Sequence, residues 1–148
     1  MTASERQQRL VDDYRLIENS FERFQIVVDT AHAKAAPFPE ASRTEEHLVP
    51  GCVSRVWLAV AKREDGSFEV WIDSEAPALK SIGALFCHIY SDGTEEEIAA
   101  TPPDFIEQLA LDRHLTPTRL RGLGQIRKKL LERIGELGVS THDAAGEG

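Results

Sequence analysis

The stretch VSRVWLAVAKREDGSFEVWID, residues 53–73, decides the fold, because two strand-like runs flank a turn in it. In residues 53–60 and 68–73 aliphatic side chains recur at every second position, which is the period of a β-strand. The turn between the runs contains Asp65-Gly66, a frequent hairpin dipeptide. The stretch therefore predicts an antiparallel β-hairpin.

The alternation of side chains also selects the register of the hairpin. A two-residue loop would pair Val60 with Trp71 and would set an aliphatic face beside a mixed polar and aromatic one. A three-residue loop over 64–66, with Gly66 in the left-handed region, instead pairs Val60 with Val70. We therefore expect the three-residue loop.

Two tryptophans lie on the face of the hairpin opposite to the aliphatic one. Trp57 and Trp71 are diagonal neighbours in the expected register. Helices that cover this face would bury both rings, whereas an exposed aromatic patch would mark a surface for a partner. The sequence leaves both interpretations open.

Helical periodicity precedes the hairpin. Apolar residues spaced three and four apart predict helix from residue 4 to about 35. Ser4 with Gln7 fits a capping box at its start. Asn19-Ser20 is a possible break, after which Ser20 would cap a second helix.

The same periodicity follows the hairpin. Thr116 as N-cap and Pro117 at the first helical position mark the start of a long final helix, which ends near residue 137. Shorter helices are expected between the hairpin and this start, over residues 76–90, 94–100 and 102–110.

This order of elements predicts an α+β fold. A small antiparallel sheet of two to three strands packs against helices, and residues 43–50 are the candidate third strand. The length of 148 residues fits one domain, which we place at 1–137, followed by a disordered tail at 138–148.

Composition excludes several classes of function. The formal net charge is −8, so the surface repels phosphate backbones and nucleic acid is not an expected partner. No apolar run reaches the roughly 18 residues of a membrane span. The N-terminus, MTASERQQRL, has no apolar signal core. We therefore expect a cytoplasmic protein.

The chain has two cysteines, Cys52 and Cys87. In a reducing compartment they are expected to be thiols, and they are too few for a zinc or iron–sulfur site built from thiolates alone. The run Glu45-Glu46-His47 lacks the spacing of a helical metal site and is expected to be a solvated loop. We therefore expect no metal and no cofactor.

Cys52 is the strongest candidate for chemistry. It follows Pro50 and Gly51 at the end of a long connection, residues 36–52, and precedes a strand. A thiol at that position can reach a partner while the strand anchors its backbone, and Gly51 removes a side chain that would crowd the sulfur. A small packed residue that opens the strand is the alternative. Cys87, inside an apolar helix, is expected to be an inert packed thiol.

Two residues near the start of the last helix could support such a thiol. Arg119 lies in the first turn, where the helix dipole disfavours a cation, so an anion such as a thiolate is a possible neighbour. A solvated arginine is the alternative. His114 could pair with Cys52 as in a hydrolase, but no orienting residue or oxyanion hole is evident, and a role in shaping the loop is the alternative.

Three motifs in this order resemble the SufE family over about residues 8–137. They are VPGCVSRVW at 49–57, DSEA at 73–76 followed by Lys80, and HLTPTR at 114–119 followed by Gly122-Leu123. Two positions depart from the family pattern. Val53 replaces a residue that is usually polar, which puts the hydrogen bonding beside the sulfur in question, and Ser81 replaces a usual glycine.

The resemblance implies a fold like that of IscU-type scaffolds and a role as an accessory protein rather than a free-standing enzyme. Cys52 would take the terminal sulfur from the persulfide of a pyridoxal-phosphate-dependent cysteine desulfurase of the SufS or CsdA type. It would pass that sulfur to an iron–sulfur scaffold and would rest in an apolar pocket between transfers. The residues expected to support Cys52 are Gly51, Ser54, Arg55, Glu75, His114 and Arg119.

Two other functions remain open at this point. The protein could be a binding module that stimulates a desulfurase allosterically without carrying sulfur. It could also be a cluster scaffold, although two distant cysteines argue against that. A homodimer is compatible with each of these functions.

Overall fold

The hairpin forms in the predicted register. The computed structural model describes the backbone of residues 1–147 and the side chains of residues 1–138. Strands β1 (Val56–Lys62) and β2 (Phe68–Ser74) are antiparallel, with Leu58 opposite Ile72 and Val60 opposite Val70. Gly66 has φ of +87°, and Arg63 N donates to Ser67 O at 2.8 Å across the three-residue loop. The prediction of this loop is confirmed.

β1 begins later than the sequence pattern indicates. The run predicted as a strand starts at residue 53, but the strand starts at Val56, where the aliphatic alternation of Val56, Leu58 and Val60 begins. One bond of the hairpin ladder continues past the strand, because Glu75 N donates to Arg55 O at 3.1 Å and Ser74 Oγ donates to the same oxygen at 2.9 Å. The chain bends at Val53 and Ser54 and leaves the sheet there.

The candidate third strand is reduced to one bridge. Leu48 pairs with Trp57, and Val49 N donates to Val56 O at 2.8 Å. The sheet of the described residues has two strands, which is the lower end of the predicted range.

Two separate helices precede the hairpin. They are α1 (Ala3–Tyr14) and α2 (Ser20–Lys34), so the break at Asn19-Ser20 is confirmed. The predicted caps are wrong by one or two positions. Thr2 forms the capping box with Glu5, and Asn19 caps α2. Both residues have an extended backbone and directly precede their helix, as an N-cap does.

Four α-helices follow the hairpin, as predicted, although the third is shorter than expected. They are α3 (Pro77–Tyr90), α4 (Glu95–Ala100), α5 (Phe105–Gln108) and α6 (Pro117–Glu147). Short 3₁₀ helices occupy three connections: η1 (Glu40–Ser42), η2 (Glu45–His47) and η3 (Leu111–His114). Thr116 Oγ1 accepts from Arg119 N at 3.2 Å, which confirms Thr116 as the N-cap of α6.

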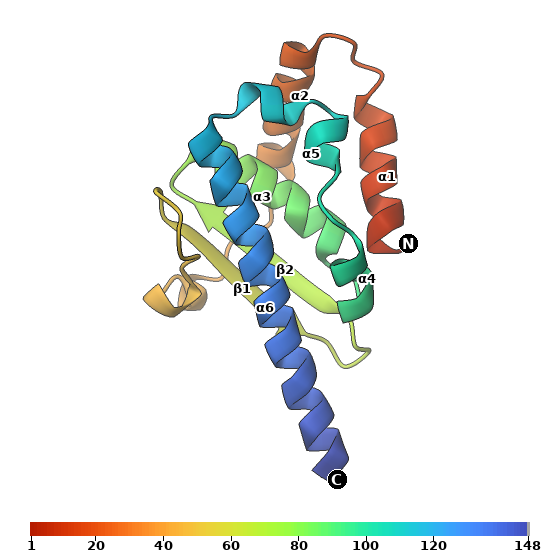
Figure 1. Cartoon of the computed structure of the whole chain (residues 1–148), viewed down its shortest axis with the longest axis vertical. Helices are drawn as coiled ribbons and strands as arrows, with labels where there is room; N and C mark the ends of the chain where they lie inside the picture. Colours follow the sequence, from red (N-terminus) through yellow and green to blue (C-terminus); the bar gives the residue numbers. More distant parts are fainter. Residues whose placement is uncertain (148) are drawn as a thin grey trace.

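α6 is longer than predicted and projects beyond the hairpin (Figure 1). The sequence pattern predicts that the helix ends near residue 137. No proline follows that position, and the helix continues to Glu147. The expected tail at 138–148 therefore begins inside α6. The side chains from residue 139 onward, and Gly148 altogether, lie outside the described residues.

The aliphatic face of the hairpin packs on α3 and α6. The side chains of Leu58 and Ile72 belong to the main core, which also contains Ile82 of α3 and Ile126 of α6. At Gly83 of α3 a Cβ atom would lie 2.6 Å from Ile72 Cγ2, so only glycine allows this close approach of helix and strand. The closeness of α3, α6 and the hairpin positions the site described below.

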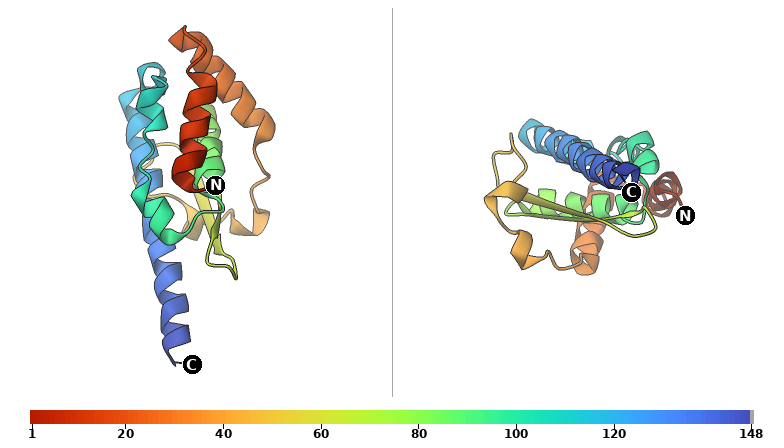
Figure 2. Two further views of the ribbon diagram at one scale, coloured as in Figure 1. Left: turned by 90° about the vertical axis from the view of Figure 1, so that its right-hand side faces the viewer. Right: turned by 90° about the horizontal axis from the view of Figure 1, so that it is seen from below.

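The tryptophan face is covered by the connection after α2 rather than by helices. Trp57 is buried with Phe38 and Ala59, and Trp71 is partly buried beside them. The Arg43 guanidinium lies 5.2 Å from the Phe38 ring centroid and 5.0 Å from that of Trp57. Figure 2 shows this connection and α6 on opposite sides of the hairpin. Within the described residues, no helix has both the length and the hydropathy to cross a bilayer.

Candidate functional site

Cys52 lies in a short loop, residues 50–55, that leads into β1. The bridge from Leu48 to Trp57 of β1 closes the base of this loop. Gly51 has φ of +84°, a conformation that glycine adopts without strain. A Cβ on Gly51 would lie 3.2 Å from Gln125 Cδ. The glycine is therefore needed for the turn and for the approach to α6, whereas the sequence analysis expected it to make room for the sulfur.

The sulfur of Cys52 rests against the backbone of α6. Its Sγ lies 3.8 Å from Gly122 O, and the residue is half-buried. A Cβ on Gly122 would lie 3.8 Å from Sγ and 3.4 Å from Leu79 Cδ1, so at this position the sulfur meets bare backbone of α6. Burial raises the pKa of the Cys52 thiol above its ordinary value.

The whole loop runs along one face of α6. Helix residues three positions apart share a face, and three such residues contact successive parts of the loop: Arg119 meets Ser54, Gly122 meets Cys52, and Gln125 is adjacent to Gly51. Gln125 was not singled out in the sequence analysis. Its position three residues after Gly122 is the only signal that could have found it.

Arg119 reaches the loop but does not act as expected. Its Nη1 donates to Ser54 Oγ at 2.9 Å. We expected Arg119 and the helix start to lower the pKa of the Cys52 thiol, and the pKa is instead raised by burial. The guanidinium is directed to the hydroxyl of Ser54, so of the two interpretations left open for Arg119, a neighbouring thiolate or solvation, neither describes its contact.

The base of the loop is tied to the end of β2. Arg55 Nε lies 3.0 Å from Glu75 Oε1, and the two side chains are 65% and 50% exposed. An ion pair this exposed contributes little to stability. The bonds from Ser74 Oγ and Glu75 N to Arg55 O, given above, hold the backbone more firmly. Arg55 at the end of the loop and Glu75 at the end of β2 thus lie side by side.

His114 belongs to a different contact. Its Nε2 lies 3.1 Å from Ser20 Oγ, and its ring centroid lies 5.7 Å from that of Phe21 and 5.3 Å from that of Phe24. All these partners are on α2, so His114 joins η3 to α2. This arrangement matches the loop-shaping alternative and offers no support for a Cys–His pair.

The two departures from the family pattern have simple environments. Val53 is 84% exposed at the loop tip, so its side chain faces solvent beside Cys52. Ser81 is buried in α3, and its Oγ donates to Pro77 O at 3.0 Å. The serine hydroxyl thus has a partner within its own helix.

Cys87 has the properties of a packed thiol. It lies in α3, where burial raises its pKa to about 12. At neutral pH the thiol is therefore protonated and a poor nucleophile. Of the two cysteines, only Cys52 lies at a loop.

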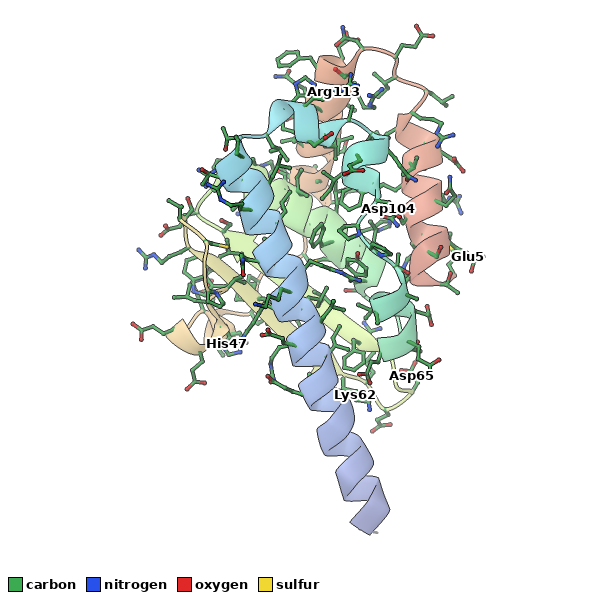
Figure 3. All side chains as sticks on the ribbon, in the orientation of Figure 1. Glu5, His47, Lys62, Asp65, Asp104 and Arg113 are labelled. Atoms are coloured by element: carbon green, nitrogen blue, oxygen red, sulfur yellow. The ribbon has the colours of Figure 1, made fainter. Side chains whose placement is uncertain are left out.

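The described residues hold no cluster of three or more side chains suited to a metal. His47 lies on η2 beside the hairpin (Figure 3), and its Nδ1 is 2.8 Å from Thr44 Oγ1. Residues 45–47 form the 3₁₀ helix η2 instead of the expected loop, with Glu45 and Glu46 exposed to solvent.

Comparison with known proteins agrees with these features. The family model SufE, described as an Fe-S metabolism associated domain, matches residues 8–134. A solution structure of a hypothetical protein from Thermus thermophilus has the same fold, with a TM-score of 0.73 and 22% identity over 92% of this chain and 97% of that one. The chain therefore belongs to the SufE family and has its role in iron–sulfur metabolism.

Proposed function

We propose that this protein accepts sulfur on Cys52 as a persulfide and delivers it for iron–sulfur cluster assembly. The donor is a pyridoxal-phosphate-dependent cysteine desulfurase of the SufS or CsdA type, and the recipient is a cluster scaffold. One observation carries the proposal: the Cys52 thiol lies on a loop of six residues, half-buried against a bare stretch of α6. Such a thiol can move outward with its loop while the strand behind it stays in place.

The transfer step resembles thiol–disulfide exchange. The Cys52 thiolate attacks the outer sulfur of the donor persulfide, and a new sulfur–sulfur bond forms on Cys52. The bond between the two donor sulfurs breaks, and the donor cysteine leaves as a thiolate that takes up the proton lost by Cys52. No external oxidant or reductant is needed, because the sulfur is transferred with its oxidation level unchanged.

The raised pKa of Cys52 shapes this mechanism. At rest the thiol is protonated and reacts slowly with oxidants and stray thiols. Activation requires that the sulfur leave its contact with Gly122, since burial is what raises the pKa. Docking on the desulfurase would supply that movement, and removal of sulfur from the enzyme would then speed its turnover. The proposal places the protein in the cytoplasm, where thiols stay reduced.

Substitution of each cysteine tests the assignment. Cys52→Ser and Cys87→Ser chains are incubated with desulfurase and cysteine, and intact masses are measured. We expect Cys87→Ser to gain one sulfur atom and Cys52→Ser to gain none, with both variants folded by circular dichroism. Equal sulfur uptake by the two variants would reject Cys52 as the acceptor.

The same incubation separates the rival functions. If the protein were an allosteric module that carries no sulfur, the Cys52→Ser variant would stimulate the desulfurase as well as the parent chain does. A cluster scaffold would show iron–sulfur absorbance after reconstitution with iron and sulfide. The sulfur carrier predicts loss of stimulation in Cys52→Ser and no such absorbance.

A further inference from the structure

A cavity lies apart from Cys52. It is enclosed by α1, α2, β2 and α3 and has a volume of about 270 Å³. Its walls are largely aliphatic, with side chains contributed by Leu10, Ala31, Val70, Ile72 and Leu85. Neither Cys52 nor Gly122, whose carbonyl oxygen contacts the Cys52 sulfur, lines it. A cavity of this size and lining is suited to a small apolar ligand.

Three polar side chains at this cavity have no partner. Among the side chains of residues 1–138, the Tyr14 hydroxyl, the Lys34 ammonium and the His88 imidazole form no hydrogen bond or ion pair. They come from three different helices, α1, α2 and α3. Lys34 and His88 are exposed and Tyr14 is partly exposed, so these groups lie at the rim of the cavity and are free to bind the polar end of a ligand whose body enters it.

The charges around these groups favour an anion. Glu69 is the acidic side chain of the lining, and Arg63 Nη2 lies 3.4 Å from its carboxylate, which offsets that charge. Burial, and then the positive charges of Arg6 and Lys34, lower the pKa of His88. Among the lining side chains, Lys34 therefore carries a positive charge with no ion-pair partner, whereas the lowered pKa keeps His88 neutral at pH 7 and able to donate a hydrogen bond.

Cys87 also lines the cavity, but it does not make the site reactive. Its pKa of about 12 keeps the thiol protonated. A protonated thiol packs like a small apolar group. The site is therefore suited to reversible binding.

We propose that this cavity binds a small carboxylate with an apolar body, whose charge lies at Lys34 and His88 and whose carbon chain lies against Leu10, Val70 and Leu85. This binding site is independent of sulfur transfer at Cys52. Its occupation would brace α2 against α3 and β2, since all three contribute to the walls.

Octanoate is the probe, and octanol is its uncharged counterpart. Each is titrated into the full chain while tryptophan fluorescence is recorded, because Trp71 lines the cavity. Lys34→Met removes the charge and keeps a long apolar stem. Lys128→Met, an exposed lysine on α6, is the matched control. Ala84→Leu fills the cavity from the wall of α3.

We expect saturable binding of octanoate that Lys34→Met weakens by about 1.4-fold to fivefold, the range that corresponds to an exposed ion pair. Lys128→Met should leave it unchanged, octanol should bind Lys34→Met and the parent chain alike, and Ala84→Leu should weaken both ligands. If Ala84→Leu fails to fold, the lysine pair still decides. Absence of saturable octanoate binding, or equal affinity in Lys34→Met and the parent chain, would overturn the proposal.

Discussion

Arg119 Nη1 lies 2.9 Å from Ser54 Oγ, and this hydrogen bond joins the first turn of α6 to the loop that carries Cys52. The side-chain contacts between loop and helix include this bond, the weak contact of Sγ with Gly122 O, and the packing of Gly51 near Gln125. Because the bond from Arg119 is the shortest of these, it should hold the loop closed more than the others do.

Removal of that bond should free the loop. We expect Ser54→Ala to speed alkylation of Cys52 by iodoacetamide about twofold to tenfold, the factor that corresponds to one net hydrogen bond. The control is Thr118→Ala, which removes a hydrogen bond from Arg121 on the same helix turn. A Ser54→Ala chain that is alkylated at the parent rate would show that the bond does not restrain Cys52.

The alkylation of Cys52 should depend on pH in a defined direction. Burial disfavours the thiolate, so the rate should reach half its maximum at a pH above the value of about 8.5 of a free cysteine. In urea the burial is lost, and the midpoint should move down toward that of a cysteine peptide. A native midpoint at or below the peptide value would mean that Arg119 or the helix start stabilises the thiolate after all.

The two cysteines should differ sharply in reactivity. At pH 8 we expect iodoacetamide to label Cys52 faster than Cys87 in the folded protein, because the pKa of about 12 keeps Cys87 protonated, and to label both at similar rates after unfolding. Peptide mapping by mass spectrometry with and without denaturant measures both rates. Labelling of Cys87 at the rate of Cys52 in native buffer would contradict its packed position.

The close approach of α3 to β2 predicts a stability effect. A Cβ on Gly83 would lie 2.6 Å from Ile72 Cγ2, so Gly83→Ala should lower the free energy of unfolding by about 1–3 kcal/mol through overpacking. Gly124→Ala is the control, since a Cβ there meets nothing within 4 Å, and it should raise stability by up to about 1 kcal/mol. Urea denaturation measures both. Similar stabilities for the two variants would mean that α3 shifts freely on the sheet.

The local elements were predictable because their signals are local. The register of the hairpin follows from the alternation of Val60 and Val70 and from the loop at Gly66, and all three lie within eleven positions of one another. The cap at Thr116 depends on the next few residues only. The residues adjacent in sequence therefore determine the hairpin register and the helix cap.

The errors arose where distant segments meet. β1 starts at Val56 instead of residue 53 because the preceding loop is held by the end of β2 and by α6. The tryptophan face is covered by the connection after α2. This connection has no helical periodicity from which its packing on the sheet could be predicted. Propensity and pattern in a single segment do not record contacts of this kind.

The candidate site was partly predictable for the same reason. Cys52, Ser54 and Arg119 were singled out, and the structure brings them together. His114 was singled out from its motif but contacts α2. The pKa of the Cys52 thiol is raised because the sulfur is buried against Gly122. The sequence does not show this contact, so it could not indicate the direction of the shift.

The central claim is that Cys52 carries the transferred sulfur. The most direct measurement is peptide mapping by mass spectrometry of the parent chain after incubation with desulfurase, with and without its cysteine substrate. The account predicts one additional sulfur atom on the peptide that contains Cys52, only when cysteine is present, and none on the peptide that contains Cys87. A Cys52 peptide of unchanged mass after full desulfurase turnover would contradict it.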